Sequence, residues 1–118
     1  MSGHKGKLAE LRFQLEASKR QIAVSVPIQE KHPYDFIIGI DDRLLKVQLK
    51  SRHTENKRMA IKRSKDRTYL LNDFDFLVIY YKKSDDWFMI PFDRFNTFVD
   101  LSSEKWLQYK NNWTFCEQ

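Results

Sequence analysis

The first twenty residues carry a helical pattern of apolar positions. Leu8, Leu11 and Leu15 recur at intervals of three and four, and neither proline nor a β-branched residue interrupts residues 5–20. On a helical wheel the charged residues gather opposite this leucine stripe, whereas Glu10 falls beside it. We therefore expect a helix that packs through its leucines, with the Glu10 carboxylate directed inward or along an edge of the core.

Two apolar runs further along the chain indicate a hairpin. Before these runs, residues 22–26 alternate between apolar and polar and predict a separate strand. Pro27 ends that strand or marks its edge. Residues 34–40 and 43–50 then flank Asp41 and Asp42, a pair suited to a two-residue turn.

The second half of the chain predicts two more strands and a short helix. Residues 74–81 form an apolar run typical of a strand buried on both faces, and a polar turn separates them from a strand at 87–90 that Pro91 ends. A short helix capped by Ser102 or Ser103 follows. This order predicts a single α/β domain over residues 1–118 that opens with a helix and is built around a mixed β-sheet flanked by helices.

The predicted hairpin brings three polar side chains together. If Asp41 and Asp42 form the turn, Asp35 lies opposite Gln48, with Cβ atoms roughly 4.5 to 5.5 Å apart, and Lys50 is diagonal to Asp35 on the same face. The other face is wholly apolar, which supports this register because a slip by one residue would place Asp35 in the core. That apolar face comprises Phe36, Ile38, Leu45, Val47 and Leu49.

This cluster has the chemistry of a hard-metal site. The carboxylate of Asp35, the amide oxygen of Gln48 and the backbone carbonyl of Leu49 suit Mg²⁺, and Glu10 from the first helix offers a second carboxylate. A bound cation eases deprotonation of water, and Lys50 could position that water or stabilise charge on a phosphate. The alternative is an ordinary alternating strand that ends in lysine, since this spacing alone arises often by chance.

Composition and charge point to an anionic partner. The chain has 118 residues, 42% of them apolar, with a formal net charge of +5 and a sequence pI near 9.4. It contains one cysteine, Cys116, and no apolar run that could cross a membrane or serve as a signal peptide, which predicts a reducing, cytoplasmic location and no membrane partner.

The positive charge is concentrated directly after Lys50. Of the 21 basic and 16 acidic residues, residues 51–67 hold seven and two, so that fourteen of each remain elsewhere. Interleaved polar residues favour nucleic-acid binding over a solvated surface, and Met59 and Ile61 suit a ribbon or loop that reads a groove. The predicted DNA contacts of this basic segment are Arg52, Lys57, Arg58, Lys62, Arg63, Lys65 and Arg67.

The motif residues resemble the PD-(D/E)XK nuclease superfamily. Pro-Tyr-Asp at residues 33–35 is similar to its first motif half, and Gln-Leu-Lys at residues 48–50 to the second, with Gln48 where most members have Asp or Glu. The opening helix around Glu10 resembles the resolvase-like branch, and residues 43–50, 73–80 and 87–91 resemble small cyanobacterial group I intron homing endonucleases.

This resemblance implies a restriction-endonuclease-like core and a metal-dependent endonuclease acting on double-stranded DNA. By resemblance, Asp35 is a metal ligand, Gln48 holds the acidic-ligand position, Lys50 is the catalytic lysine and Glu10 is the auxiliary carboxylate. The cofactor would be Mg²⁺, with Mn²⁺ as a substitute. Cutting both strands implies a homo-oligomer, a dimer or a dimer of dimers, with its interface expected in residues 92–115.

Three functions remain open at the level of sequence. The resemblance favours a site-specific homing endonuclease; a Holliday junction resolvase uses the same chemistry but reads DNA shape, and a DNA-binding module with a decayed nuclease site is compatible with the neutral Gln48. Asp73 and Asp75 are interpreted as solvated or turn-capping residues. The tryptophans are interpreted as core or interface residues.

Overall fold

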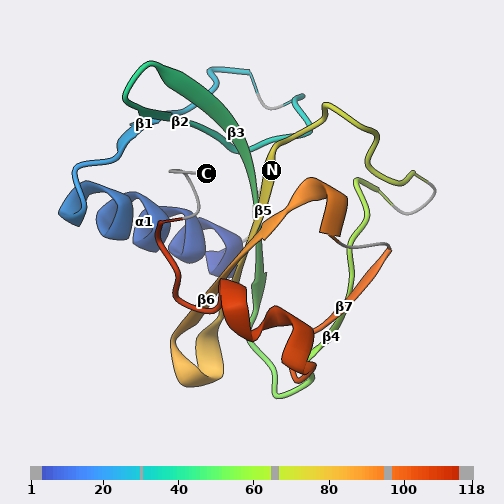
Figure 1. The fold of residues 1–118 in the computed structure, drawn as a ribbon. Helices are drawn as coiled ribbons and strands as arrows, with labels where there is room; N and C mark the ends of the chain where they lie inside the picture. Colours follow the sequence, from blue (N-terminus) through green and yellow to red (C-terminus); the bar gives the residue numbers. More distant parts are fainter. Residues whose placement is uncertain (1–3, 30, 65–66, 95–96, 115–118) are drawn as a thin grey trace.

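A computed structural model describes residues 4–29, 31–64, 67–94 and 97–114. Its centre is a five-stranded sheet in the order β1-β2-β3-β5-β6 (Figure 1). These strands are β1 (Ala23–Ser25), β2 (Phe36–Ile40), β3 (Arg43–Arg52), β5 (Phe76–Tyr81) and β6 (Asp86–Pro91). The β3–β5 pair is parallel and the other neighbours are antiparallel, so the sheet is mixed as predicted.

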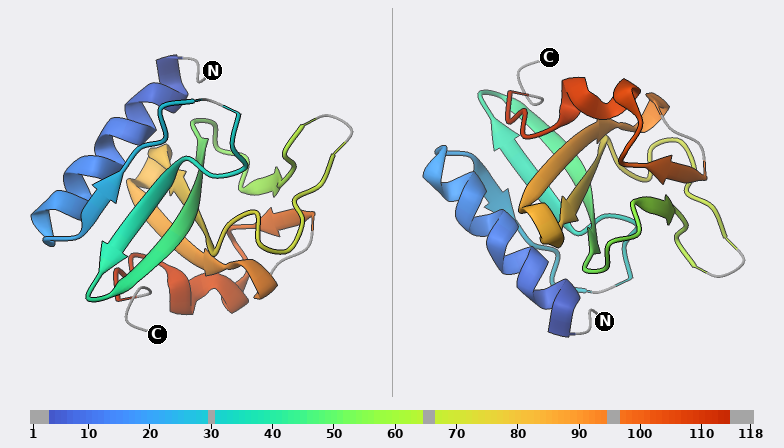
Figure 2. Two further views of the ribbon diagram at one scale, coloured as in Figure 1. Left: turned by 90° about the horizontal axis from the view of Figure 1, so that it is seen from above. Right: turned by 90° about the horizontal axis from the view of Figure 1, so that it is seen from below.

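Smaller elements complete the fold. Helix α1 (His4–Lys19) lies along one face of the sheet, and the two-stranded sheet of β4 (Arg58–Ala60) and β7 (Phe98–Asp100) lies beyond the other (Figures 1 and 2). Three 3₁₀ turns complete the set: η1 (Lys82–Ser84), η2 (Phe92–Arg94) and η3 (Glu104–Tyr109). In the described part of the chain no helix is long and apolar enough to span a membrane.

The helix packs through a different face from the one we predicted. Leu11 and Leu15 are 54% and 56% exposed, whereas Ala9, Phe13 and Ala17 are buried. The two alanines let the helix approach the sheet closely, and the Phe13 ring stacks on Phe36 at a centroid distance of 5.0 Å. The leucine stripe is therefore not the core face, although the position of Glu10, described below, agrees with its prediction.

Two apolar layers sandwich the central sheet. One lies between the sheet and α1, and the other lies between the sheet and the β4, β7 and η3 side. All six residues of β5 are buried, which confirms a strand covered on both faces. The predicted burial of the tryptophans is also confirmed, because Trp87 and Trp106 are buried and Trp113 packs against the first layer.

The structure corrects two expectations in the second layer. Met59 and Ile61 are 4% and 2% exposed, so they belong to the core and cannot read a DNA groove. The helix at residues 104–109 is 3₁₀, and Ser103 stands at its N-cap position without a side-chain capping bond. Ser102 does not cap it either, because its N–H and hydroxyl donate to Asp100. Cys116 lies outside the described residues.

Candidate active site

The site forms where β3 changes partner. Residues Arg43 to Val47 pair with β2, in the register that the sequence predicted, and Val47 to Arg52 pair with β5. Val47 is the residue that pairs with both strands. Beyond it β2 has ended, so β3 has an open edge at which side chains replace the missing strand.

Asp35 closes part of this open edge. Its backbone N–H donates to the Val47 carbonyl at 2.8 Å, and its Oδ2 accepts the Leu49 N–H at 2.7 Å. Burial raises the pKa of the Asp35 carboxyl; the Leu49 N–H and the Lys50 charge oppose this rise, and nearby Glu10 adds to it. Asp35 is thus a half-buried carboxylate held in a fixed orientation beside a second one.

Gln48 and Leu49 contribute two further oxygens beside Asp35. Gln48 is 7% exposed and is the one buried polar side chain among the described residues. Its Nε2 donates to the Leu49 carbonyl at 3.2 Å. Rotating the Gln48 amide by about 180° would direct its Oε1 at the Leu49 carbonyl oxygen instead. Two oxygens in this position are favourable when a cation lies between them.

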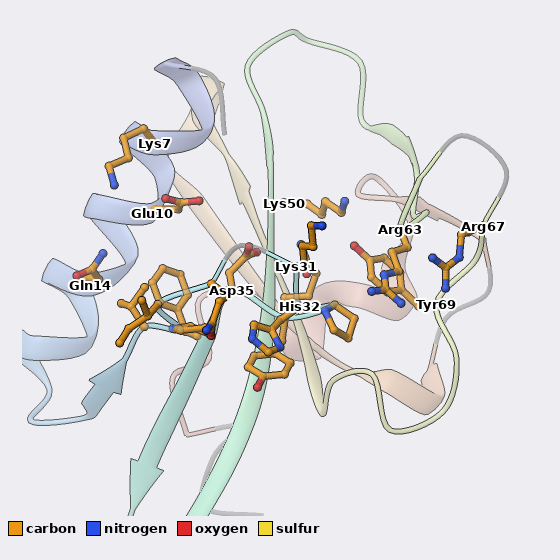
Figure 3. Close-up of a pocket in the computed structure, with 18 residues that line it drawn as sticks. Lys7, Glu10, Gln14, Lys31, His32, Asp35, Lys50, Arg63, Arg67 and Tyr69 are labelled. Carbon is orange, nitrogen blue, oxygen red and sulfur yellow. The ribbon is translucent and has the colours of Figure 1, made fainter. Parts of the chain in front are cut away.

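Lys50 reaches away from Asp35 towards the segment after β4. Its Nζ donates to the Lys62 carbonyl at 3.2 Å and lies 5.5 Å from the centroid of the Tyr69 ring. Figure 3 shows this orientation, with Lys50 and Tyr69 on the same side of the pocket. Burial lowers the pKa of Lys50, and the Asp35 charge opposes that shift.

Glu10 completes the set of predicted site residues. It projects from α1 into the same cavity as Asp35, Gln48 and Lys50, a hollow of about 790 Å³ (Figure 3). This agrees with the prediction that the carboxylate is directed inward or along an edge of the core. The structure brings all four predicted catalytic residues to one pocket.

The donors present fit a hard divalent cation. The described residues contain no group of three or more His, Cys, Asp or Glu side chains that could hold a metal. A cation would therefore need the Gln48 amide or the Leu49 carbonyl in addition to Asp35 and Glu10. All four offer oxygen, which is the ligand type that Mg²⁺ prefers.

The basic segment divides between pocket, surface and internal contacts. Arg63 and Arg67 line the pocket, and Lys62 is exposed beside it. Arg58 is exposed and lies over the Phe98 ring, and Lys57 lies over Tyr81. Arg52 is turned inward, because its Nη2 donates to the Arg58 carbonyl at 3.3 Å while its Nε has no hydrogen-bond partner in the described region. Lys65 lies outside the described residues.

Sequence reasoning missed several pocket residues. Tyr69, Lys7, Lys31 and His32 line the cavity, but no motif or spacing distinguishes them from other surface residues. Burial raises the pKa of Tyr69 to about 12, so its hydroxyl stays protonated at neutral pH. By contrast, Asp73 behaves as predicted, since it caps a turn by accepting the Leu70 N–H. Asp75 does not: it is half-buried and accepts the Lys46 N–H of β3, so it is neither solvated nor a turn cap.

Comparisons with known proteins agree with this geometry. A search of curated proteins finds no match. Among solved structures, the chain is similar to the bacterial homing endonuclease I-Ssp6803I, with a TM-score of 0.80 and 23% sequence identity over 98% of this chain and 93% of that one. This likeness shows a shared fold. The family model described as PD-(D/E)XK endonuclease matches residues 2–114, nearly the whole chain. The chain therefore belongs to the PD-(D/E)XK endonuclease family, and the resemblance drawn from its motif residues is confirmed.

Proposed function

We propose that this protein is a divalent-metal-dependent endonuclease that cleaves double-stranded DNA at a specific site. The observation that carries the proposal is the convergence of Glu10, Asp35, Gln48 and Lys50 on one pocket. Membership of a nuclease family supports the chemistry, and similarity to a homing endonuclease supports the site-specific role.

The residues divide the work of phosphodiester hydrolysis. The Asp35 carboxylate, the Gln48 amide and the Leu49 carbonyl would hold Mg²⁺. Glu10 would bind the same cation directly or through a water molecule. A bound cation supplies positive charge at the phosphate and lowers the pKa of a coordinated water. The Leu49 N–H fixes the Asp35 carboxylate, so the ligand geometry is set before substrate arrives.

Lys50 acts on the substrate itself. A rotation away from the Lys62 carbonyl would bring its ammonium to an oxygen of the scissile phosphate. There it stabilises the negative charge that develops as the water oxygen bonds to phosphorus and the bond to the leaving sugar oxygen breaks. The lowered pKa of Lys50 also makes Nζ a readier proton carrier than an exposed lysine.

The basic segment would grip DNA beside the pocket. Arg63 and Arg67 line the cavity, and Lys57, Arg58 and Lys62 are exposed elsewhere on the segment. Arg52 takes a supporting role in this proposal, because its guanidinium holds the backbone of Arg58. One pocket cuts one strand, so we infer that the enzyme acts as a homo-oligomer.

The direct test is cleavage of a random-sequence plasmid library with Mg²⁺, with Mn²⁺ and with EDTA. The wild-type protein should cut a subset of sequences with either metal and none with EDTA, and Asp35→Ala and Lys50→Ala should bind DNA without cutting. Efficient cutting of four-way junctions without sequence preference would favour a resolvase and contradict the homing role.

The orientation of Gln48 favours a second candidate, a DNA-binding module with a decayed site. Its amide nitrogen already satisfies the Leu49 carbonyl, so the pocket is internally bonded without a metal. Under this alternative, the wild-type protein binds DNA but cuts neither the library nor a junction with any divalent metal.

A further inference from the structure

The active-site pocket is lined by cations from three separate parts of the chain. Arg63 and Arg67 belong to the basic segment, but Lys7 comes from α1 and Lys31 from the connection between β1 and β2. Figure 3 shows Lys7 beside Glu10 on the helix, while Arg63 and Arg67 lie at the other side of the cavity. The positive charge around the site therefore extends beyond residues 51–67.

Lys7 lines the pocket, whereas the cations towards the end of α1 and directly after it do not. Arg12, Lys19 and Arg20, outside this pocket, each form an ion pair, with Asp85 or with Glu16. Lys7 and Lys31 are exposed and form no ion pair with any residue that the structure describes. Their charges are thus available to a ligand that enters the pocket.

The neighbouring residues hold these two lysines close to the site. Lys7 precedes Glu10 by three residues, so the two lie on the same face of α1, within about one turn, or 5.4 Å. Lys31 precedes Asp35 by four residues; between them Pro33 restricts the backbone, and the rings of His32 and Tyr34 pack at 5.2 Å. A DNA strand advances 3.4 Å per nucleotide. One such step is shorter than the helical turn between Lys7 and Glu10, so the phosphate next to the scissile one is within reach of Lys7.

A polyanion also needs this charge in order to approach. Glu10 and Asp35 place two carboxylates at the base of the pocket, and they repel the phosphate backbone. Arg63 and Arg67 offset that repulsion from the basic-segment side. Near Glu10 and Asp35, other cations have to offset the same repulsion of the phosphate backbone.

We propose that Lys7, on α1, and Lys31, in the connection between β1 and β2, form a second phosphate-binding set, which holds the strand being cut together with the basic segment at the far side of the pocket (Figure 3). This inference rests on the proposed function. Its ligand is the DNA phosphate backbone flanking the scissile bond, and no base is read by these contacts.

The test is the salt dependence of binding to a random-sequence duplex, measured by fluorescence anisotropy in EDTA. A double variant, Lys7→Gln with Lys31→Gln, keeps the side-chain stems and removes both charges. The logarithmic salt slope should become shallower by about two, with affinity about tenfold weaker for every sequence tested. Lys19→Gln is the matched control, because Lys19 stands on the same helix outside the pocket. Its slope should equal that of the wild-type protein.

Cleavage kinetics provide a second, independent readout. With Mg²⁺, the double variant should raise KM about tenfold and leave kcat unchanged, because contacts to flanking phosphates stabilise ground and transition states equally. A fall in kcat at constant KM would overturn the proposal by placing these lysines among the reacting groups.

The outcomes separate this inference from the proposed function. If Arg63→Ala flattens the salt slope but the double variant matches Lys19→Gln, the second set is wrong and the nuclease proposal stands. If the wild-type protein binds no duplex at any salt concentration, the DNA function falls together with the inference. Circular dichroism of each variant confirms that the fold is intact.

Discussion

The two halves of β3 carry nearly the same set of interactions, but one of them builds the candidate site. At the hairpin half, Asp75 accepts the Lys46 N–H at 2.8 Å, and the Lys46 ammonium donates to the Asn72 carbonyl and lies 5.9 Å from the Tyr34 ring. The far half repeats this pattern: Asp35 accepts the Leu49 N–H, and Lys50 donates to a carbonyl over a tyrosine ring.

The difference lies in what surrounds each set. Asp35 and Lys50 share a cavity with Glu10, Gln48 and several cations, whereas neither Asp75 nor Lys46 lines that cavity. An aspartate that bonds to the edge of β3, together with a lysine of β3, is thus a structural pair by default. A second carboxylate, an amide and room for a substrate turn the same pair into a reactive site.

The largest expected effect is the contrast between the two aspartates. Asp35→Ala should lower single-turnover cleavage by about 10³-fold or more, because it removes a metal ligand, while Asp75→Ala should stay within about threefold. Both variants lose a charge-assisted bond to a backbone N–H, so Asp75→Ala should be destabilised by about 1–3 kcal/mol. Equal losses of cleavage would show that both aspartates act only through the fold.

A smaller effect is expected at Gln48. Gln48→Glu restores the carboxylate usual at this position and should tighten Mg²⁺ binding about tenfold, because a charged ligand binds the cation more strongly than an amide. Gln48→Ala should weaken it by a similar factor. Titration calorimetry of Mg²⁺ or Mn²⁺ measures both, and unchanged metal affinity in Gln48→Glu would remove Gln48 from the ligand set.

The two tyrosines test whether an aromatic ring positions its lysine. Tyr69→Leu should reduce cleavage about fivefold and shift the pH–rate profile, since the Lys50 ammonium loses its cation–π partner. Tyr69→Phe keeps the ring and should restore the wild-type profile. Tyr34→Leu removes the ring beside Lys46 from another cavity-lining position, so its pH–rate profile shows the effect of losing a nearby ring while Lys50 keeps its own. A profile unchanged in Tyr69→Leu would assign Tyr69 a packing role alone.

The smallest effect concerns stability without metal. Burial raises the pKa of the Asp35 carboxyl, so ionising it costs free energy in the folded protein. This cost is absent below the pKa of the unfolded state. It reduces the free energy of unfolding as the pH rises towards and through the pKa of the folded state. Asp35→Asn in EDTA should therefore be more stable than wild type at pH 7 and lose that advantage as the pH falls towards the unfolded pKa. Added Mg²⁺ should stabilise only the wild-type protein. Denaturant unfolding at pH 7 and at that lower pH measures this difference.

The hairpin and its three site residues were predictable because their signal is local. Asp35, Gln48 and Lys50 meet through the period of two in a strand and the length of one turn, and a register slip would have buried Asp35. Glu10 needed the helical period as well. The family motif then gave these residues their roles.

The rest depends on contacts that are distant in sequence. The buried face of α1 was decided by the fit of Ala9 and Ala17 against the sheet, which outweighed the greater hydrophobicity of Leu11 and Leu15. Alternation at residues 58–62 was the available signal for β4 and for burial of Met59 and Ile61, but the high charge of the segment concealed it. Tyr69 enters the pocket through tertiary folding, and no spacing could identify it.

The bond from Lys50 to the Lys62 carbonyl has a consequence for retargeting this enzyme. The same short stretch of chain supplies side chains that we propose bind DNA and the backbone acceptor of Lys50, the proposed catalytic lysine. Replacing that stretch to recognise another sequence would disturb cleavage at the same time. Within the described residues, neither Lys7 nor Lys31 bonds to Lys50, so these two positions offer engineers a place to strengthen or weaken affinity while leaving the chemistry intact.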